Sequence, residues 1–191
     1  MKKSMISIVM ALLCLFLKVS AQSLTTETEK PNGVKPLIIG DKVPDLEFSN
    51  APNMPGGKLK LSDYRGKALI LDFWGTWCSA CIMHFPHNQK LQNKFSKNLQ
   101  FLLINDSVRD SLESVIVFLN KRKKDNEQIM LPVIQTHKDT RDLFPHRSYP
   151  HYVWIGADRR LKAITTADEL EEESLERLIA GFDLDLPIKR P

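Results

Sequence analysis

The chain has 191 residues, of which 42% are hydrophobic and 26% charged, and its formal net charge is +4. This length and composition are sufficient for one soluble domain with its own hydrophobic core. Three lysines, Lys2, Lys3 and Lys18, precede residue 22, and the remaining chain has 24 basic and 23 acidic residues. A basic patch or a clear excess of basic residues is typical of nucleic-acid binding proteins, and nothing in this balance points to that class, so we expect no nucleic-acid partner.

Residues 1–21 have the pattern of a secretory signal peptide. A positively charged start is followed by the apolar run Met5–Leu17 and by the small residues Val19-Ser20-Ala21. The run is shorter than the roughly 20 apolar residues of a membrane span. We therefore predict cleavage before Gln22 and a periplasmic mature protein, with membrane attachment only if the segment stays uncleaved. Cys14 lies in the apolar run and is lost with it, which leaves two cysteines in an oxidising compartment.

Residues 22–37 are polar and are predicted to form a flexible leader. We expect ordered structure to begin near Ile38. Two short strands, Asp45–Phe48 and Leu59–Leu61, are separated by a loop rich in turn residues, and this pattern indicates a β-hairpin. The segment Ser62–Lys67 then forms a one-turn connection to the central part of the chain.

The central part is a predicted buried strand that leads into a helix. The run Ala68–Phe73 is apolar except for Asp72, which is typical of a strand covered on both faces. Cys78 and Cys81 follow, three residues apart, and the mixed segment Ile82–Leu99 is predicted to continue as a helix. The two cysteines therefore stand where a buried strand turns into a helix.

This position has chemical consequences for both cysteines. The free N–H groups and positive partial charge of a helix N-terminus stabilise a thiolate, so we expect a lowered pKa for the Cys78 thiol. Cys81 lies one turn further on, within reach of a mixed disulfide formed on Cys78. An acid inside a hydrophobic strand is costly because burial raises its pKa. Asp72 is therefore a candidate to accept and return the proton of Cys81.

After this helix, Gln100–Asn105 is predicted to form a second parallel strand. Asp110 and Glu113 have the spacing of a capping box at the start of a further helix, which the basic run 121–124 closes. The apolar stripe of that helix is predicted to consist of Leu112, Val115, Ile116 and Leu119. The segment Met130–Gln135 is a candidate edge strand, interrupted at its proline.

The last part of the chain reads as a hairpin and a helix. Tyr152–Gly156 and Leu161–Thr165 are predicted to form the two strands of the hairpin. Leu170–Ala180 is an amphipathic helix that ends at Gly181. Residues 182–191 are predicted to be a C-terminal tail or linker.

The run from Leu71 to Cys81, LDFWGTWCSAC, resembles the thioredoxin active-site signature as it occurs in periplasmic TlpA/ResA-like thiol:disulfide oxidoreductases. Pro86 stands where thioredoxins have a helix-kinking proline, and Tyr149-Pro150 resembles their cis-proline element. The resemblance covers residues 38–181. It implies an α/β thioredoxin-like fold, with a central mixed sheet flanked by helices and the predicted N-terminal β-hairpin as an extension.

The resemblance also implies a function. The chain is expected to be a thiol:disulfide oxidoreductase in which Cys78–Cys81 is the redox disulfide. In thioredoxins the cis-proline loop lies against the cysteine pair, and the implied contacts with substrate are Trp77, Tyr149, Pro150 and His151. The implied partners are proteins with disulfides, among them apocytochrome c, and a membrane thiol electron donor, and no cofactor is implied.

Two points stay open at the level of the sequence. His151 is either a substrate contact or a residue that only fills the start of an outer strand. The dipeptide Ser79-Ala80 between the cysteines has neither the proline of thioredoxin nor a histidine that would strongly stabilise the thiolate. Its composition favours a reductase over an oxidase.

Several other chemistries compete with this interpretation. A possible zinc site is suggested by cysteine and histidine at every third residue, namely Cys78, Cys81, His84 and His87. On a helix each step of three residues turns by about 300°, so the four side chains point to different faces and cannot converge on one ion. We therefore expect no metal. Haem attachment through C-x-x-C-H fails because residue 82 is an isoleucine.

Two alternatives remain. In a peroxiredoxin-like peroxidase the threonine stands three places before the reactive cysteine, with a proline further back. Here Thr76 stands only two places before Cys78, and the positions where that proline could stand hold Leu71 and Gly75 instead. A non-enzymatic copper-handling thiol protein is the other alternative, with His151 beside the two thiols as a soft-metal ligand.

Overall fold

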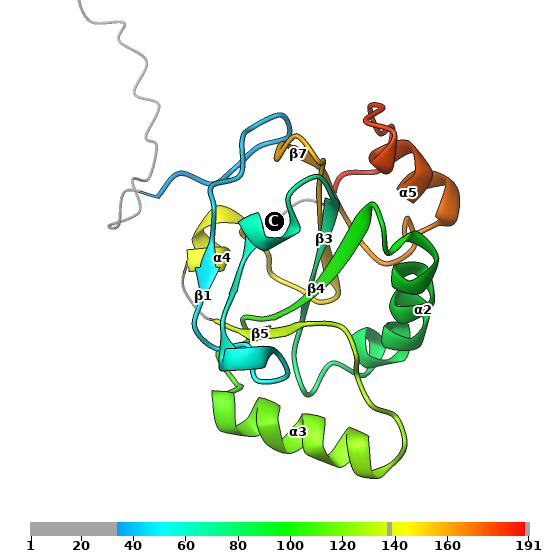
Figure 1. The fold of residues 1–191 in the computed structure, drawn as a ribbon. Helices are drawn as coiled ribbons and strands as arrows, with labels where there is room; N and C mark the ends of the chain where they lie inside the picture. Colours follow the sequence, from blue (N-terminus) through cyan, green and yellow to red (C-terminus); the bar gives the residue numbers. More distant parts are fainter. Residues whose placement is uncertain (1–33, 137–138, 190–191) are drawn as a thin grey trace, which may run out of the picture. The chain divides into compact units, whose positions relative to one another are not determined.

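The computed structural model describes residues 34–136 and 139–189, so the predicted signal peptide, Cys14 and most of the predicted leader lie outside the described residues. A five-stranded mixed sheet with the strand order β5-β4-β3-β6-β7 forms the centre (Figure 1). Its strands are β3 (Ala68–Trp74), β4 (Leu99–Asn105), β5 (Val133–Gln135), β6 (His151–Ile155) and β7 (Leu161–Thr165). The helices are α2 (Ser79–Phe95), α3 (Leu112–Lys124), α4 (Asp139–Leu143) and α5 (Glu172–Ile179).

A second, two-stranded antiparallel sheet precedes this domain core. It consists of β1 (Glu47–Phe48) and β2 (Leu59–Lys60). One 3-10 turn, Pro55–Gly57, lies in the loop between these strands, and another, Leu61–Tyr64, comes directly after β2. The predicted thioredoxin-like α/β fold with an N-terminal hairpin is therefore confirmed. The domain boundaries at residues 38 and 181 stay predictions.

The central strand β3 separates two hydrophobic clusters. It pairs in parallel with β4 and antiparallel with β6, and all seven of its residues are buried. Its alternate residues Ile70 and Trp74 pack in one cluster with side chains of α2, α3 and α5. Leu71 and Phe73 pack in the other cluster with the hairpin and α4. Figure 1 shows α2 and α5 on one side of the sheet, and β1 with α4 on the other.

One predicted helix end and one predicted helix cap are corrected by the structure. The helix after the cysteines begins at Ser79 with Cys78 as its N-cap, as the position of the cysteine pair predicts, but it ends at Phe95 instead of Leu99, because Leu99 opens β4. The next helix is capped by Ser111, whose side chain accepts from the Ser114 N–H at 3.1 Å while the Ser114 hydroxyl accepts from the Ser111 N–H. The predicted capping box of Asp110 and Glu113 is therefore wrong.

The apolar stripe of α3 is only partly covered. Val115 is fully buried, whereas Ile116 is exposed. Phe118, which was not in the predicted stripe, packs against the Trp74 ring with the ring centroids 5.2 Å apart. The covered side of α3 thus includes Phe118 in place of the predicted Ile116.

The segment after α5 runs back along the domain. Leu184 and Leu186 pack against the hydrophobic cluster of α2 and α5. The Lys189 N–H donates to the Ile164 carbonyl of β7 at 2.8 Å. Within residues 34–136 and 139–189, no helix is both long enough and apolar enough to cross a membrane.

Candidate active site

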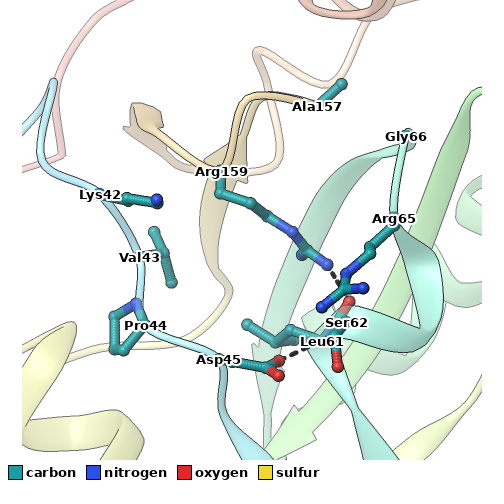
Figure 2. A pocket seen from close by; sticks show the side chains of 10 residues that line it. All are labelled: Lys42, Val43, Pro44, Asp45, Leu61, Ser62, Arg65, Gly66, Ala157 and Arg159. Atoms are coloured by element: carbon teal, nitrogen blue, oxygen red, sulfur yellow. Dashed lines mark hydrogen bonds between the residues drawn. The ribbon is translucent and has the colours of Figure 1, made fainter.

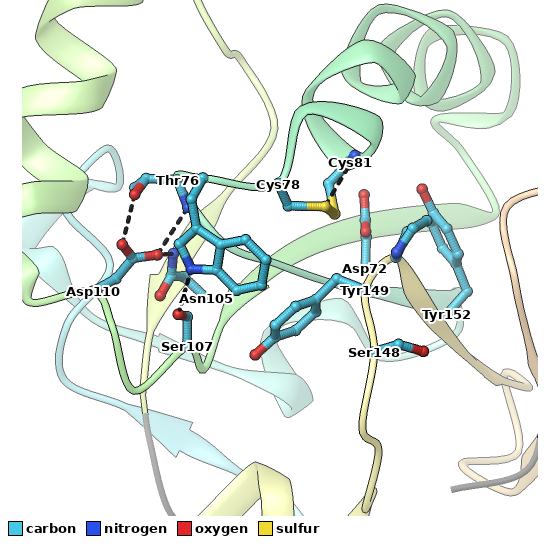
Figure 3. Close-up of a disulfide and its surroundings, with 12 residues drawn as sticks. Asp72, Thr76, Cys78, Cys81, Asn105, Ser107, Asp110, Ser148, Tyr149 and Tyr152 are labelled. Atoms are coloured by element: carbon cyan, nitrogen blue, oxygen red, sulfur yellow. Dashed lines mark hydrogen bonds between the residues drawn. A yellow bond between two sulfur atoms is a disulfide. The ribbon is translucent and has the colours of Figure 1, made fainter.

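Cys78 and Cys81 form a disulfide at the first turn of α2 (Figure 3). The Cα atoms of the two cysteines are 5.3 Å apart, and the Cys78 Sγ accepts a hydrogen bond from the Cys81 N–H at 3.2 Å. Cys78 is 7% exposed, whereas Cys81 is fully buried. A partner from solution therefore has access to the Cys78 sulfur before that of Cys81. The N–H groups of the first helical turn stabilise negative charge on Cys78.

The Asp72 carboxyl lies on the same side of the sheet as the disulfide (Figure 3). It is fully buried, and its Oδ2 accepts a hydrogen bond from the Asn88 side-chain amide at 2.9 Å. The Tyr152 hydroxyl lies beside the carboxyl and accepts a hydrogen bond from the Asn88 amide at 3.1 Å. Burial raises the pKa of Asp72 well above its usual value, and the polar groups of Asn88 and Tyr152 offset only part of this shift. The protonated form of Asp72 is therefore favoured more than it is for an exposed carboxyl.

Asn88 and Tyr152 are the functional candidates that sequence reasoning missed. Asn88 lies on α2 two turns after Cys81, on the same face of the helix, and is fully buried. Tyr152 stands opposite Asp72 in the β3–β6 register. Burial and the neighbouring Asp72 raise the pKa of the Tyr152 hydroxyl well above 10, so it stays a donor at neutral pH. The sequence did contain a signal for Asn88. It stands seven residues, or two helical turns, after Cys81, so the two side chains share one face of the helix.

Trp77 forms part of the surface beside the disulfide. Its ring is 48% exposed, and its Nε1 donates to the Ser107 hydroxyl at 2.9 Å. The Arg109 guanidinium lies 4.7 Å from the ring centroid, in cation–π geometry. A Cβ at Gly75 would lie only 2.9 Å from Trp77 Nε1, so the glycine is what lets the indole fold back over the loop.

Asp110 fixes the loop between β3 and α2. Its carboxylate accepts from the Thr76 N–H at 2.8 Å, from the Thr76 hydroxyl at 2.6 Å and from the Asn105 amide at 2.8 Å. These bonds, two of which reach across 34 residues of sequence to Thr76, explain why Asp110 does not cap α3. They also commit the Thr76 hydroxyl to the scaffold, which weakens the peroxidase alternative.

The Tyr149-Pro150 peptide bond is cis, as the resemblance implies. The Tyr149 ring contacts the Trp77 ring edge-on, with centroids 5.6 Å apart, and its hydroxyl donates to Asp106 Oδ1 at 2.5 Å. Burial, followed by the bond to Asp106, raises the pKa of the Tyr149 hydroxyl. Arg141 donates to the same hydroxyl and lies 3.4 Å from Asp106. The Tyr149 side chain is therefore held beside Trp77 by the ion pair of Arg141, which is one third exposed, with the buried Asp106.

His151 does not reach this surface. It stands opposite Phe73 in the β3–β6 register and is fully buried. Its ring stacks on the His146 ring at 4.5 Å, in the layer that contains Phe73 and faces away from the cysteines. Burial, with the charges of His146 and Lys189, lowers the pKa of His151 to about 2. Of the two interpretations that the sequence leaves open, this placement favours the one in which His151 fills the start of a strand, because strand alternation turns the ring inward on the opposite face.

The same placement removes His151 as a copper ligand beside the thiols. In the parts of the chain that the structure describes, no group of three or more histidine, cysteine, aspartate or glutamate side chains could hold a metal ion. His87 instead contacts the Leu170 carbonyl at 3.1 Å. The arrangement at the start of α2 is therefore suited to thiol chemistry with proton transfer.

A family model described as the AhpC/TSA family matches residues 39–141, more than half of the chain. Thioredoxin-like protein YneN of Bacillus subtilis is 26% identical over 111 residues, which cover 58% of this chain and 61% of YneN. Thiol-disulfide oxidoreductase ResA of Bacillus subtilis is 37% identical over 65 residues, which cover 31% of this chain and 36% of ResA. The matches thus span less than two thirds of these relatives.

Solved structures agree with this relationship. A protein of Chlorobium tepidum assigned as the thiol:disulfide interchange protein DsbE has a TM-score of 0.60 and 26% identity, over 76% of this chain and 97% of its own. The exposed lipoprotein thioredoxin Etrx1 of Streptococcus pneumoniae shares the fold, with a TM-score of 0.57 and 23% identity over 73% of this chain and 100% of its own. The chain belongs to the AhpC/TSA family, within the thioredoxin-like proteins, and is a distant homologue of the ResA and DsbE-type thiol-disulfide oxidoreductases.

Proposed function

We propose that this protein is a thiol:disulfide oxidoreductase that reduces disulfides in other proteins outside the cytoplasm. The observation that carries the proposal is the Cys78–Cys81 disulfide at the start of α2, with the buried carboxyl of Asp72 on the same side of the sheet. The relationship to ResA and to the DsbE structure supports the same chemistry.

In the first step, the thiolate of reduced Cys78 attacks one sulfur of a substrate disulfide. A bond forms between Cys78 and that sulfur, the substrate S–S bond breaks, and the departing substrate thiolate takes up a proton from water. Cys78 is the attacking residue because it is the more exposed cysteine and because the first turn of α2 stabilises its thiolate.

In the second step, Cys81 resolves the mixed disulfide. Its thiol passes a proton to the Asp72 carboxylate, the Cys81 sulfur bonds to the Cys78 sulfur, and the second substrate sulfur leaves as a thiolate. Two electrons have then moved from the protein to the substrate. The Asn88 amide and the Tyr152 hydroxyl orient Asp72 during this transfer.

The substrate lies over Trp77 and along the backbone at Tyr149 and Pro150. The half-exposed Trp77 ring and the Tyr149 ring, held by Asp106, offer a rigid apolar surface beside the disulfide. Proteins with disulfides are the substrate class, and apocytochrome c cysteines are the substrate that the family resemblance suggests. A membrane thiol carrier would return two electrons to the pair in each cycle.

Single cysteine variants test the proposal. Cys78→Ser removes the attacking sulfur, so the rate of insulin disulfide reduction falls to the uncatalysed rate. Cys81→Ser keeps the attack but not the resolution, so covalent complexes with substrate accumulate and are visible on non-reducing gels. If Cys78→Ser trapped complexes as readily as Cys81→Ser, the assigned roles would be wrong.

A further inference from the structure

A cavity of about 590 Å³ lies at the end of β3 that is remote from the disulfide (Figure 2). Gly66, which lines it, precedes the first residue of β3, whereas the cysteine pair follows the last. The walls come from the segment before β1, from the turn after β2 and from the loop between β6 and β7. The lining residues are Lys42, Val43, Pro44, Asp45, Leu61, Ser62, Arg65, Gly66, Ala157 and Arg159.

The cavity has an excess of positive charge. Lys42, Arg65 and Arg159 line it, and Asp45 is its one acidic residue. The Asp45 carboxylate accepts from the Ser62 N–H at 2.8 Å, and the Ser62 side chain, followed by this N–H, lowers the pKa of Asp45, so the group is negatively charged at neutral pH. Three cations and one carboxylate leave two positive charges without a counter-charge in the cavity.

Arg159 is held in a conformation that its residue type does not favour. Its φ is +65°, in the left-handed region, where glycine or asparagine is the usual residue of such a turn. The turn between β6 and β7 therefore places a guanidinium at a position where a small residue is usual.

The Arg159 guanidinium is only partly satisfied by the protein. One of its terminal nitrogens, Nη2, donates to the Leu61 carbonyl, while Nη1 is buried and has no hydrogen-bond partner among the residues that the structure describes. Burial lowers the pKa of Arg159, and the charge of Asp45, which raises it, is partly opposed by the charge of Arg65. Figure 2 shows the Arg65 and Arg159 guanidinium groups converging on the same part of the cavity. An oxyanion between them would supply acceptors and offset their repulsion.

We infer that this cavity binds a small organic phosphate monoester. A phosphate monoester has a charge near −2 at neutral pH, which matches the excess of two positive charges, and its oxygens suit two guanidinium groups. The cavity volume is within the range of about 300–1,000 Å³ typical of small-ligand sites. Val43, Pro44 and Leu61 are the apolar lining residues beside which the organic part of the ligand would lie. This site is independent of the proposed redox function.

Titration of the full chain with phenyl phosphate tests the inference, with binding followed through the backbone amide signals of Gly66 and Ala157 by NMR. Saturable shifts are expected, with binding at least about tenfold tighter than that of benzoate, which has only one negative charge. Arg159→Met and Arg65→Met should each weaken binding about tenfold. Arg65 is exposed, so its replacement tests the site even if the Arg159 variant fails to fold.

Arg160→Met is the matched control, because it removes the same charge from the next residue, whose side chain binds the Gly40 carbonyl and does not line the cavity. Binding to this variant should change less than about twofold. The inference is overturned if Arg160→Met weakens binding as much as Arg159→Met, if benzoate binds as tightly as phenyl phosphate, or if the shifts do not saturate.

Discussion

At the scale of single residues, the Asp72 carboxyl couples proton binding to the stability of the fold. Its pKa is raised by burial, so in the folded protein the neutral acid is favoured. The unfolded chain releases this proton near pH 3.9. As the pH rises above that value and through the folded pKa, the stability that protonated Asp72 contributes is therefore lost.

Asp72→Asn should remove this loss, because an amide does not ionise. The variant is expected to be more stable than the parent protein at pH 8, and the difference should shrink as the pH falls toward 4. Urea unfolding of both oxidised proteins across this range measures it. The same variant should slow the resolving step by about a hundredfold, since the proton acceptor of Cys81 is missing.

Asn88→Leu separates the position of the carboxyl from its presence. The hydrogen bond from Asn88 lowers the pKa of Asp72, so its loss should raise that pKa further and move the pH profile of the resolving step upward. Asn93→Leu, on an exposed position of the same helix, is the control and should leave the profile in place.

For the Asp72→Asn variant, an unchanged rate of the resolving step would remove the carboxyl from the mechanism altogether.

The predictable part of the candidate site is the part that depends on neighbours in sequence. Cys78, Cys81 and Asp72 were found because a buried strand, a helix start and one misplaced acid are local patterns. The place of the His151 ring depends on strand alternation, which sends it to the face opposite Tyr152, and its position next to Pro150 in the sequence does not reveal this. The contacts of Asn88 depend on the packing of α2 against β6, which no local pattern specifies.

At the scale of elements, the same distinction explains which parts of the fold the sequence predicts. Strand β3 and the β6–β7 hairpin are continuous apolar runs bounded by turn residues, and the structure has them nearly where they were expected. The start of α3 was displaced by one residue because Asp110 is drawn to Thr76 and Asn105, at the ends of two other elements. A long-range partner thus outcompeted the local cap, and Ser111 took its place.

The segment after α5 is the element whose contacts suggest a role at the site. The Lys189 ammonium donates to the Ser148 and Pro150 carbonyls, each at 2.7 Å, and so brackets the Tyr149 backbone. Partial burial lowers the pKa of Lys189. Because these two bonds fix the loop that would contact substrate, the segment is expected to position that loop.

Lys189→Met should therefore raise the KM for a protein disulfide while kcat stays close to that of the parent. A net contribution of about 0.5–1.5 kcal/mol for a hydrogen bond corresponds to about a two- to tenfold change. Steady-state kinetics with insulin measure it, and Lys97→Met, at an exposed position outside the loop, is the matched control. A fall in kcat with an unchanged KM would contradict a positioning role.

At the scale of the whole molecule, the reduction potential decides the direction of electron flow. The potential is the difference in stability between the oxidised and the reduced folded protein, so any group that stabilises the Cys78 thiolate raises it. In this chain the thiolate has the backbone N–H groups of α2, but the residues between the cysteines, Ser79 and Ala80, bring no positive charge. Strongly oxidising pairs have additional thiolate stabilisation of that kind.

The potential of the Cys78–Cys81 pair is therefore expected near that of thioredoxin, at about −250 mV or below, rather than near the value of about −120 mV of DsbA. Equilibration of the mature protein with dithiothreitol and glutathione buffers measures it. A value in the expected range means that the reduced pair donates electrons to most protein disulfides and needs a dedicated electron source. A value near −120 mV would mean that the pair accepts electrons and installs disulfides. It would also mean that the N–H groups of α2 alone stabilise the Cys78 thiolate as strongly as an added cation does in strongly oxidising pairs.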